Sequence, residues 1–507
     1  MPKSIAIIGA GVAGLAAGCY AQMNGYQSEI FEMHDLPGGL CTAWERRDYV
    51  FDGCIHYLLG TAPGQPYHAL WDELGVTDIP AINHDEMMRV VGSDGRTFVL
   101  YCDPDRLEAH LVDLAPGDEK PLRAFCRGVR QFLDFDLSAM QAKPRQLMSG
   151  ADGLALGRQM LPYLRPLMQW GRLSAADFAA RLHDPFLRRA FELVFGWPEI
   201  PIMAGMSLLA AMQTQNAGFP TGGSLAFARA LEARYVALGG TIHYKAQVEQ
   251  ILVENDRAAG VRLYDDSEHR ADYVISAADG RGTIFHMLDG KYVERGLGRM
   301  YAGEQTLHSQ VQVSFGVTRD LRNEPHWVTY LYDEPFMLAG EARTDLGVKN
   351  YCFDPSLAPA GSSSVVVMAR SEYPYWQRIY GRKLYDTEQL QVADIILAEL
   401  EKIYPGIGAD VKVTDVATPL SYERYTGNWL GSTCGWLLTT KMVKPMILGV
   451  RKTLPGLGNF YMAGQWVEPG GMVPVVAMSG RNAIQLICHA DGRAFHTTAP
   501  AAEKVMA

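Results

Sequence analysis

The first 32 residues constrain the fold more than any other part of this chain. The apolar run 4–8 predicts a buried parallel strand, and the loop GAGVAG follows it directly at 9–14. In such a loop, Gly9 permits a tight turn, Gly11 lets the backbone approach a pyrophosphate, and Gly14 lets the next helix pack closely on the strand. The stretch therefore predicts a phosphate-binding loop between a strand and a helix.

A helix and a second strand complete this motif. The helix covers 15–23 and ends at Asn24-Gly25. The strand 28–32 ends in Glu32, about 20 residues after the glycines, where a carboxylate accepts hydrogen bonds from a ribose 2′-hydroxyl. The order of these features predicts an α/β dinucleotide-binding domain. Its predicted nucleotide contacts are Gly9, Gly11, Ala13, Gly14 and Glu32.

Composition narrows the class of protein. The 507 residues, 48% of them hydrophobic, are enough for two or three domains with a large core. A formal charge of −10 and the lack of a basic cluster argue against a nucleic-acid partner. The eight cysteines show no CxxC and no metal-ligand spacing, which predicts a cytoplasmic protein without a metal site. The longest apolar stretch, 200–212, is shorter than the roughly 20 residues that span a bilayer, so no transmembrane helix is expected.

The predicted elements alternate between two domains. A hairpin of 87–91 and 97–101 begins the second domain, and a largely helical stretch follows from 104 to 212. A helix at 225–238 and several strands up to residue 279 return the chain to the nucleotide. The predicted dinucleotide-binding domain comprises 1–75, 215–295 and 419–490, the predicted substrate domain comprises 76–214 and 296–418, and the predicted tail covers 491–507.

The stretch 157–170 is rich in leucine, methionine and aromatic residues. Pro162 and Pro166 prevent it from forming one long helix. Such stripes most often pack in a core, which is the favoured interpretation. A lipophilic channel or a membrane-docking face is the alternative.

A second glycine-rich turn lies near the C-terminus. A strand at 457–464 and a loop at 465–472 lead into a helix that begins at Val473, with Pro474 in its first turn. Free N–H groups at such a helix start favour the negatively charged parts of a cofactor. The predicted contacts there are Gly464, Gln465, Gly471, Met472, Val473 and Pro474.

Three segments resemble one known family. The pair Gly38-Gly39 resembles the extended fingerprint of FAD enzymes, and FDGCIHYLLG at 51–60 resembles a segment of retinol saturases and, more loosely, of phytoene desaturases. The ending AG…PGG…P…A…SG is similar to theirs. The chain thus resembles FAD-dependent oxidoreductases of the phytoene desaturase, carotenoid isomerase and retinol saturase family over nearly its whole length. The resemblance implies FAD as the cofactor, held by a Rossmann-like domain of the amine-oxidase and phytoene-desaturase type, with a discontinuous α+β substrate domain.

The resemblance also implies further FAD contacts. In this family a strand of the type V-x-x-I passes the adenine, which places Val248 there, and the residues after the sequence VIS pass the nucleotide. A plain β-meander is the alternative for these strands. The contacts that the resemblance adds are Met33, Gly38, Gly39, Leu40, His56, Val248, Ala277 and Ala278.

The chemistry has fewer sequence signals than the cofactor. No second GxGxxG is present, so no nicotinamide domain is expected and the electron donor or acceptor stays open. Hydride transfer needs an apolar slot that holds a C–H or C=C against the flavin, with an acid or base for one proton. His56 is the candidate for that proton, with a structural role as the alternative. Asp52 and Trp466 are candidate flavin neighbours. Tyr422, Tyr425, Trp429 and Trp466 are candidates to line the substrate slot, and core packing is equally compatible with them.

Three functions fit these features. The first is an FAD enzyme that desaturates, saturates or isomerises carbon–carbon bonds of a lipophilic, isoprenoid-like substrate, with peripheral membrane contact. The second is a flavin amine oxidase, although GQW at 464–466 and GGM at 470–472 resemble the desaturase ending better. The third is a non-enzymatic protein that binds flavin or lipid.

Overall fold

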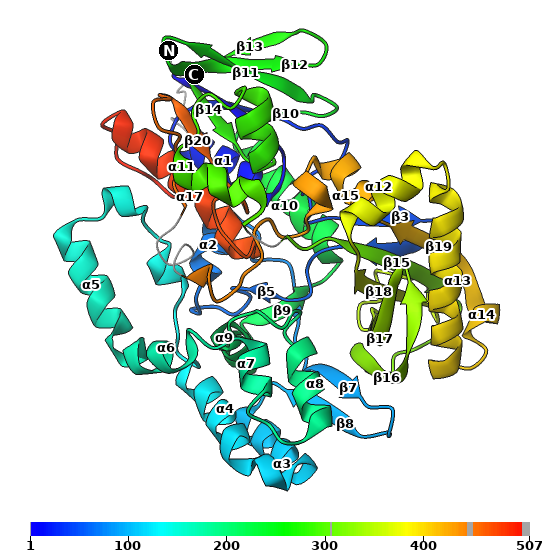
Figure 1. Cartoon of the computed structure of the whole chain (residues 1–507). Coiled ribbons are helices and arrows are strands. Elements are labelled where there is room, and N and C mark those ends of the chain that lie inside the picture. The colour runs from blue at the N-terminus through cyan, green and yellow to red at the C-terminus, as the bar shows by residue number, and fades with distance from the viewer. Residues whose placement is uncertain (1, 305–306, 444–449, 499–507) are drawn as a thin grey trace.

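Two sheets organise the chain. The computed structural model describes residues 2–304, 307–443 and 450–498, and part of the predicted tail, 499–507, lies outside these ranges. A five-stranded sheet lies on one side of the molecule, and a seven-stranded sheet lies on the other side (Figure 1).

The five-stranded sheet is assembled from three distant parts of the chain. Its strand order is β10-β2-β1-β14-β20, and all neighbouring strands are parallel. The strands β1 and β14 are buried on both faces, as parallel strands between helices are. The bounds are β1 Ser4–Ile8, β2 Gln27–Phe31, β10 Thr241–His243, β14 Tyr273–Ser276 and β20 Phe460–Met462.

Three helices pack beside this sheet: α1 (Val12–Met23), α10 (Gly223–Ala237) and α17 (Val473–Ala490). Glycines let them approach closely, because a Cβ at Gly18 would lie 2.6 Å from the Tyr235 ring. Since α1 follows β1 and α17 follows β20 in a parallel sheet, both helices begin at the same sheet edge.

Smaller sheets extend this domain. The strands β11, β12 and β13 form an antiparallel sheet, β3 and β4 form a hairpin, and β9 pairs with β5 and β6. Their bounds, with that of α2, are β3 Ala43–Arg46, β4 Tyr49–Asp52, β5 Leu58–Leu59, α2 His68–Glu73, β6 Ala81–Ile82, β9 Ala217–Pro220, β11 Val248–Glu254, β12 Arg257–Leu263 and β13 Glu268–Arg270.

The seven-stranded sheet has the order β19-β15-β18-β17-β16-β7-β8. Only the pair β16 and β7 is parallel among the pairings described. The strands are β7 Glu86–Val91, β8 Thr97–Tyr101, β15 Gln310–Val317, β16 Trp327–Leu338, β17 Glu341–Asn350, β18 Ser363–Arg370 and β19 Val411–Ala417. The helices beside them are α12 Tyr373–Gly381, α13 Tyr385–Ile403, α14 Ile407–Asp410 and α15 Pro419–Thr426.

A helical region joins the two sheets. An aromatic core of Phe125, Phe178 and Phe191, with ring centroids 5.0–5.3 Å apart, holds it together. The helices are α3 Pro104–Leu114, α4 Glu119–Gln131, α5 Gly150–Met160, α6 Leu164–Trp170, α7 Ala175–Ala179, α8 Pro185–Leu193 and α9 Ile202–Gln213, and α11 (Arg295–Arg299) lies further along the chain.

The interpretation of 157–170 as core is wrong for three of its apolar side chains. Leu161, Leu164 and Met168 are 65%, 48% and 75% exposed, while Trp170 is buried. The reason is that α5 and α6, separated by a turn at Pro162, lie at the outer edge of the molecule (Figure 1).

Within the described ranges, no helix combines the length and the apolar character needed to cross a membrane. All eight cysteines are described, and each is a free thiol.

Candidate active site

A cavity of about 260 Å³ lies at the edge of the five-stranded sheet where α1 and α17 begin. We call it the nucleotide cavity. Most of the predicted cofactor contacts line it: Gly9, Gly11, Ala13, Glu32, Met33, Gly38, Gly39, Leu40, Val248, Ala277, Ala278, Gly464, Gln465, Gly471 and Val473.

The other predicted contacts lie next to this cavity. Gly14 packs beneath the loop, where a Cβ would lie 2.0 Å from the Gly9 carbonyl oxygen. Pro474 is buried in the first turn of α17. His56 and Met472 line a second cavity, described below.

The nucleotide cavity has the features that a dinucleotide requires. The first turns of α1 and α17 lack side-chain caps, so their N–H groups are available to phosphate or flavin oxygens. A Cβ at Gly11 would have Gly38 as its nearest neighbour at 3.7 Å and would project toward the cavity that both glycines line. These residues fit a bound pyrophosphate.

Glu32 is held rigidly at the end of β2. Its Oε2 accepts a hydrogen bond from Ala10 N at 2.6 Å, and its Oε1 accepts one from His34 N at 2.9 Å. Burial raises the pKa of this carboxyl, and the two N–H groups oppose that rise. A carboxylate can accept about four hydrogen bonds, so capacity remains for ribose hydroxyls.

Asn428, which the sequence did not indicate as a site residue, forms a group of hydrogen bonds in the wall of this cavity. Asn428 Oδ1 accepts hydrogen bonds from Gln465 Nε2 at 3.0 Å and from the Trp466 indole at 3.1 Å. Burial raises the pKa of Asp279, another residue of the cavity wall, to about 6. These contacts fix the side chains of the loop that precedes α17.

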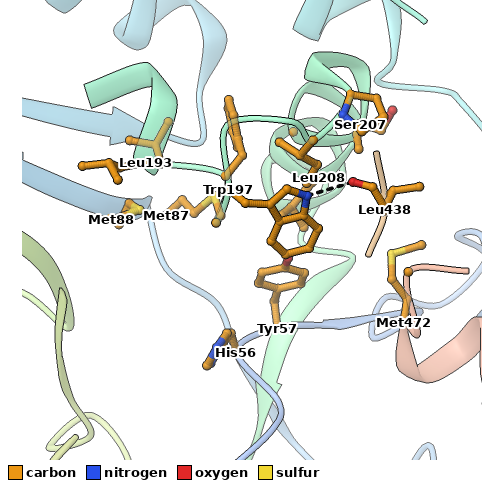
Figure 2. Close-up of a pocket in the computed structure, with 18 of the residues that line it drawn as sticks. His56, Tyr57, Met87, Met88, Leu193, Trp197, Ser207, Leu208, Leu438 and Met472 are labelled. Carbon is orange, nitrogen blue, oxygen red and sulfur yellow. Dashed lines mark hydrogen bonds between the residues drawn. The ribbon is translucent and has the colours of Figure 1, made fainter. Parts of the chain in front are cut away.

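A second cavity of about 560 Å³ lies between the helical region and strands β16 to β18. We call it the apolar cavity. Its wall includes Met87, Met88, Leu193, Trp197, Leu208 and Leu438, and the Trp197 indole donates to the Leu438 carbonyl at 2.8 Å (Figure 2). Mostly hydrophobic walls with few polar groups are typical of a site for an apolar ligand.

The two cavities adjoin at two places along the chain. Cys54 lines the nucleotide cavity and His56 the apolar one. The same alternation occurs at the start of α17, where Val473 lines the nucleotide cavity and Met472 lines the apolar cavity. These two segments therefore form a wall between the two cavities.

A buried lysine stands beside His56 in the apolar cavity. Strand β17 carries Lys349, only 5% exposed, and its Nζ lies 2.8 Å from His56 Nδ1. Burial lowers the pKa of Lys349 to about 7, although the Asp52 carboxylate opposes the shift. Burial and the neighbouring Lys349 also lower the pKa of His56 well below its ordinary value. Both effects favour the neutral imidazole, and its Nδ1 is hydrogen-bonded to Lys349 Nζ.

Asp52, a predicted flavin neighbour, is fully buried beneath this segment. It accepts hydrogen bonds from Ser224 N at 2.6 Å, Ser224 Oγ at 2.8 Å and Cys54 N at 3.0 Å. These hydrogen bonds tie the segment that carries His56 to Ser224 at the start of α10.

The predicted substrate residues lie elsewhere than in the apolar cavity. Tyr422 and Tyr425 line a third cavity of about 1090 Å³ next to α12, α13 and α15. The Tyr422 hydroxyl accepts a hydrogen bond from Gln310 Nε2 and donates one to Gln312 Oε1. Trp429 packs against Trp436 and Trp466 with ring centroids 6.4 Å apart, and Trp466 lines the nucleotide cavity.

Comparison with known proteins agrees with this geometry. Residues 12–488 match the model of the family described as flavin containing amine oxidoreductase. The chain is 25% identical to a lycopene-forming phytoene desaturase of Pseudescherichia vulneris, over 96% of this chain and 99% of that protein. It is 24% identical to the chloroplastic prolycopene isomerase 1 of an Oncidium hybrid cultivar, over 94% of this chain and 82% of that protein. A putrescine oxidase variant with a redesigned cofactor site shares the fold, with a TM-score of 0.61 and 17% identity over 96% of this chain and 99% of that one.

The fold and the nucleotide cavity define an FAD-dependent oxidoreductase. The chain belongs to the flavin containing amine oxidoreductase family, and FAD is its cofactor. The predicted α/β FAD-binding fold is confirmed, as is the resemblance to phytoene desaturases and carotenoid isomerases. The resemblance to retinol saturases stays a prediction.

Proposed function

We propose that this enzyme desaturates, saturates or isomerises carbon–carbon bonds of a lipophilic, isoprenoid-like substrate. The observation that carries the proposal is the apolar cavity of about 560 Å³ that adjoins the nucleotide cavity. Relatives named phytoene desaturase and prolycopene isomerase support a polyene as the substrate.

The chain's own residues would hold the substrate and one proton. When bound, FAD supplies the acceptor or donor of a hydride. The apolar wall aligns the substrate and excludes water. His56 Nδ1 lies 2.8 Å from Lys349 Nζ, so Nε2 would give its proton while Lys349 passes one to Nδ1, and Nε2 would take up a proton by the same two transfers in reverse. Lys349, with a pKa of about 7, replaces that proton at little cost.

The same pair argues against an amine substrate. An amine is protonated at neutral pH, and a protonated Lys349 in the same cavity would repel it. The putrescine oxidase likeness concerns the fold alone.

The test is anaerobic incubation of the holoenzyme with polyenes, retinoids and amines, followed through the flavin and polyene absorption bands. We expect a polyene to change the flavin spectrum, or its own spectrum if the reaction is an isomerisation. Lys349→Met should slow this change, whereas Tyr425→Phe, in the third cavity, should not. Flavin reduction by an amine, with no response to any polyene, would refute the proposal, and so would inertness toward the whole panel.

We also propose that the helical arm, residues 150–170, rests on a lipid surface. Its exposed leucines and Met168 alternate with the exposed Arg158 and Arg165, which suits an anionic bilayer. Residues 132–137, which precede the arm, include side chains that line the apolar cavity. A substrate dissolved in lipid would thus enter close to the arm.

Flotation with vesicles of phosphatidylcholine and phosphatidylglycerol tests this contact. The double variant Leu161→Asp/Met168→Asp should lose vesicle binding. Leu390→Asp, at a residue of α13 that is 67% exposed, is the matched control and should keep it. Equal flotation of the two variants would remove the arm from membrane contact.

A further inference from the structure

The hairpin of β3 and β4 carries a cysteine at the open end of each strand. Its register pairs Ala43 with Asp52, and a hydrogen bond from Gly53 N to Thr42 O at 3.1 Å continues the pairing. The next position along this register places Cys41 opposite Cys54. The two cysteines are 13 positions apart in the sequence, so no CxxC pattern reveals them.

The backbone geometry at this position suits a disulfide. Cys41 N donates to Gly38 O, and Cys54 N donates to Asp52 Oδ1, so the two cysteines exchange no backbone hydrogen bond. Both cysteines lie just beyond the strand ends, in bends. A non-hydrogen-bonded pair in a regular antiparallel ladder has Cα atoms about 4.5 Å apart, and a disulfide spans about 4.4–6.8 Å.

The two thiols also meet. Cys41 Sγ lies 3.7 Å from the Ser224 carbonyl oxygen. The neighbouring Cys54 side chain and burial raise the pKa of Cys41 well above its ordinary value. Cys41 is 4% exposed and Cys54 is half-buried, and both line the nucleotide cavity.

We propose that Cys41 and Cys54 are a redox-active dithiol that hydrogen peroxide closes to a cross-strand disulfide in the wall of the FAD site. The more exposed Cys54 thiolate attacks one peroxide oxygen, the O–O bond breaks, and hydroxide leaves a sulfenic acid on Cys54. The Cys41 sulfur then attacks the Cys54 sulfur, and its proton leaves with the sulfenic hydroxyl as water. Two thiols are oxidised by two electrons, and one hydrogen peroxide is reduced to two waters. The inference requires no particular substrate.

The first experiment counts thiols. The reduced holoenzyme is treated with hydrogen peroxide, denatured, and titrated with a thiol reagent. We expect the count to fall from eight to six and to return to eight after dithiothreitol. Mass spectrometry should identify one linked pair of peptides, which contain Cys41 and Cys54. Eight remaining thiols, or linkage through other cysteines, would overturn the proposal.

Variants separate the roles of the two thiols. In Cys41→Ser, Cys54 should stop at the sulfenic acid and be labelled by dimedone, whereas wild-type Cys54 should escape the label. Cys352→Ser removes another half-buried thiol, outside this pair, and should still form the linked peptides. No dimedone label on Cys54 in folded, FAD-containing Cys41→Ser would contradict the assigned order of attack.

Discussion

Lys349 gives the most quantitative prediction. Its pKa is about 7 in the folded protein, against an ordinary value of 10.5. Between these values the unfolded chain keeps a proton that the native protein has released. Stability rises with pH wherever the unfolded state binds more protons, so Lys349 makes the free energy of unfolding rise across this window. Below pH 7 both states are protonated, and the full cost of burying the ammonium, about 5 kcal/mol, is present.

Lys349→Met should abolish this dependence. The methionine fills a similar volume without a titratable group, so it should stabilise the protein most at low pH. Relative to the variant, wild type should gain about 2 kcal/mol of stability between pH 7 and pH 9. Urea unfolding at several pH values, followed by tryptophan fluorescence, measures the free energy of unfolding of both proteins. The other titrating groups contribute equally to both, so their contributions cancel in the difference.

Lys245→Met is the matched control, because the Lys245 side chain is 75% exposed. Its stability difference from wild type should be constant over the same pH range. Parallel curves for wild type and Lys349→Met would refute the inferred burial cost. In the anaerobic assay, Lys349→Met should also react about 10²- to 10⁴-fold more slowly, the span typical of a positioned acid or base.

Other substitutions test the FAD site and the segment that carries His56. Glu32→Ala should raise the Kd for FAD roughly ten- to a hundredfold in titrations of apoprotein, because ribose bonds worth about 1.5–3 kcal/mol are lost. Gly11→Val should leave the purified protein without FAD, since its side chain occupies the pyrophosphate space, and the visible spectrum would report this directly. His56→Gln should keep FAD and Tm but slow flavin reduction about 10²- to 10⁴-fold; if turnover per bound flavin stays at the wild-type level, His56 has a structural role. Ser224→Ala leaves Ile55 N and Asp52 short of a partner, so Tm should fall, corresponding to about 1–3 kcal/mol of lost stability.

The elements at the FAD site could be predicted because their signals are local. The glycine loop, its helix and the two strands occupy consecutive positions, and the structure gives β1 the predicted bounds of Ser4–Ile8. The predicted hairpin of 87–91 and 97–101 is also present as β7 and β8. The prediction of core packing for 157–170 fails at Leu161, Leu164 and Met168, because a stripe of apolar residues does not reveal whether a partner surface covers it.

The sequence predicts His56 as the proton candidate, but it could not predict the neighbouring Lys349, because the two residues are distant in sequence. His56 and Lys349 are 293 positions apart, and only the placement of β17 beside the 52–56 segment brings them within 2.8 Å. The sequence shows Lys349 between Val348 and Asn350, in a strand whose other charged residues, Glu341, Arg343 and Asp345, are only half-buried. Its burial depends on the aromatic rings of Trp327 and Tyr351, whose centroids lie 4.8 and 5.0 Å from Nζ.

The position of Lys349 also bears on the choice of reaction. Burying the Lys349 ammonium costs the folded protein about 5 kcal/mol of stability. If the cavity only had to bind a hydrocarbon, an apolar residue at this position would avoid that cost. A pure carrier of lipid would therefore gain stability from methionine at this position without losing function. The proposed proton exchange with His56 would give the lysine a role that methionine cannot fill, since a group with a pKa near 7 both gives and takes a proton at neutral pH. The buried pair thus favours catalysis in the apolar cavity over binding alone.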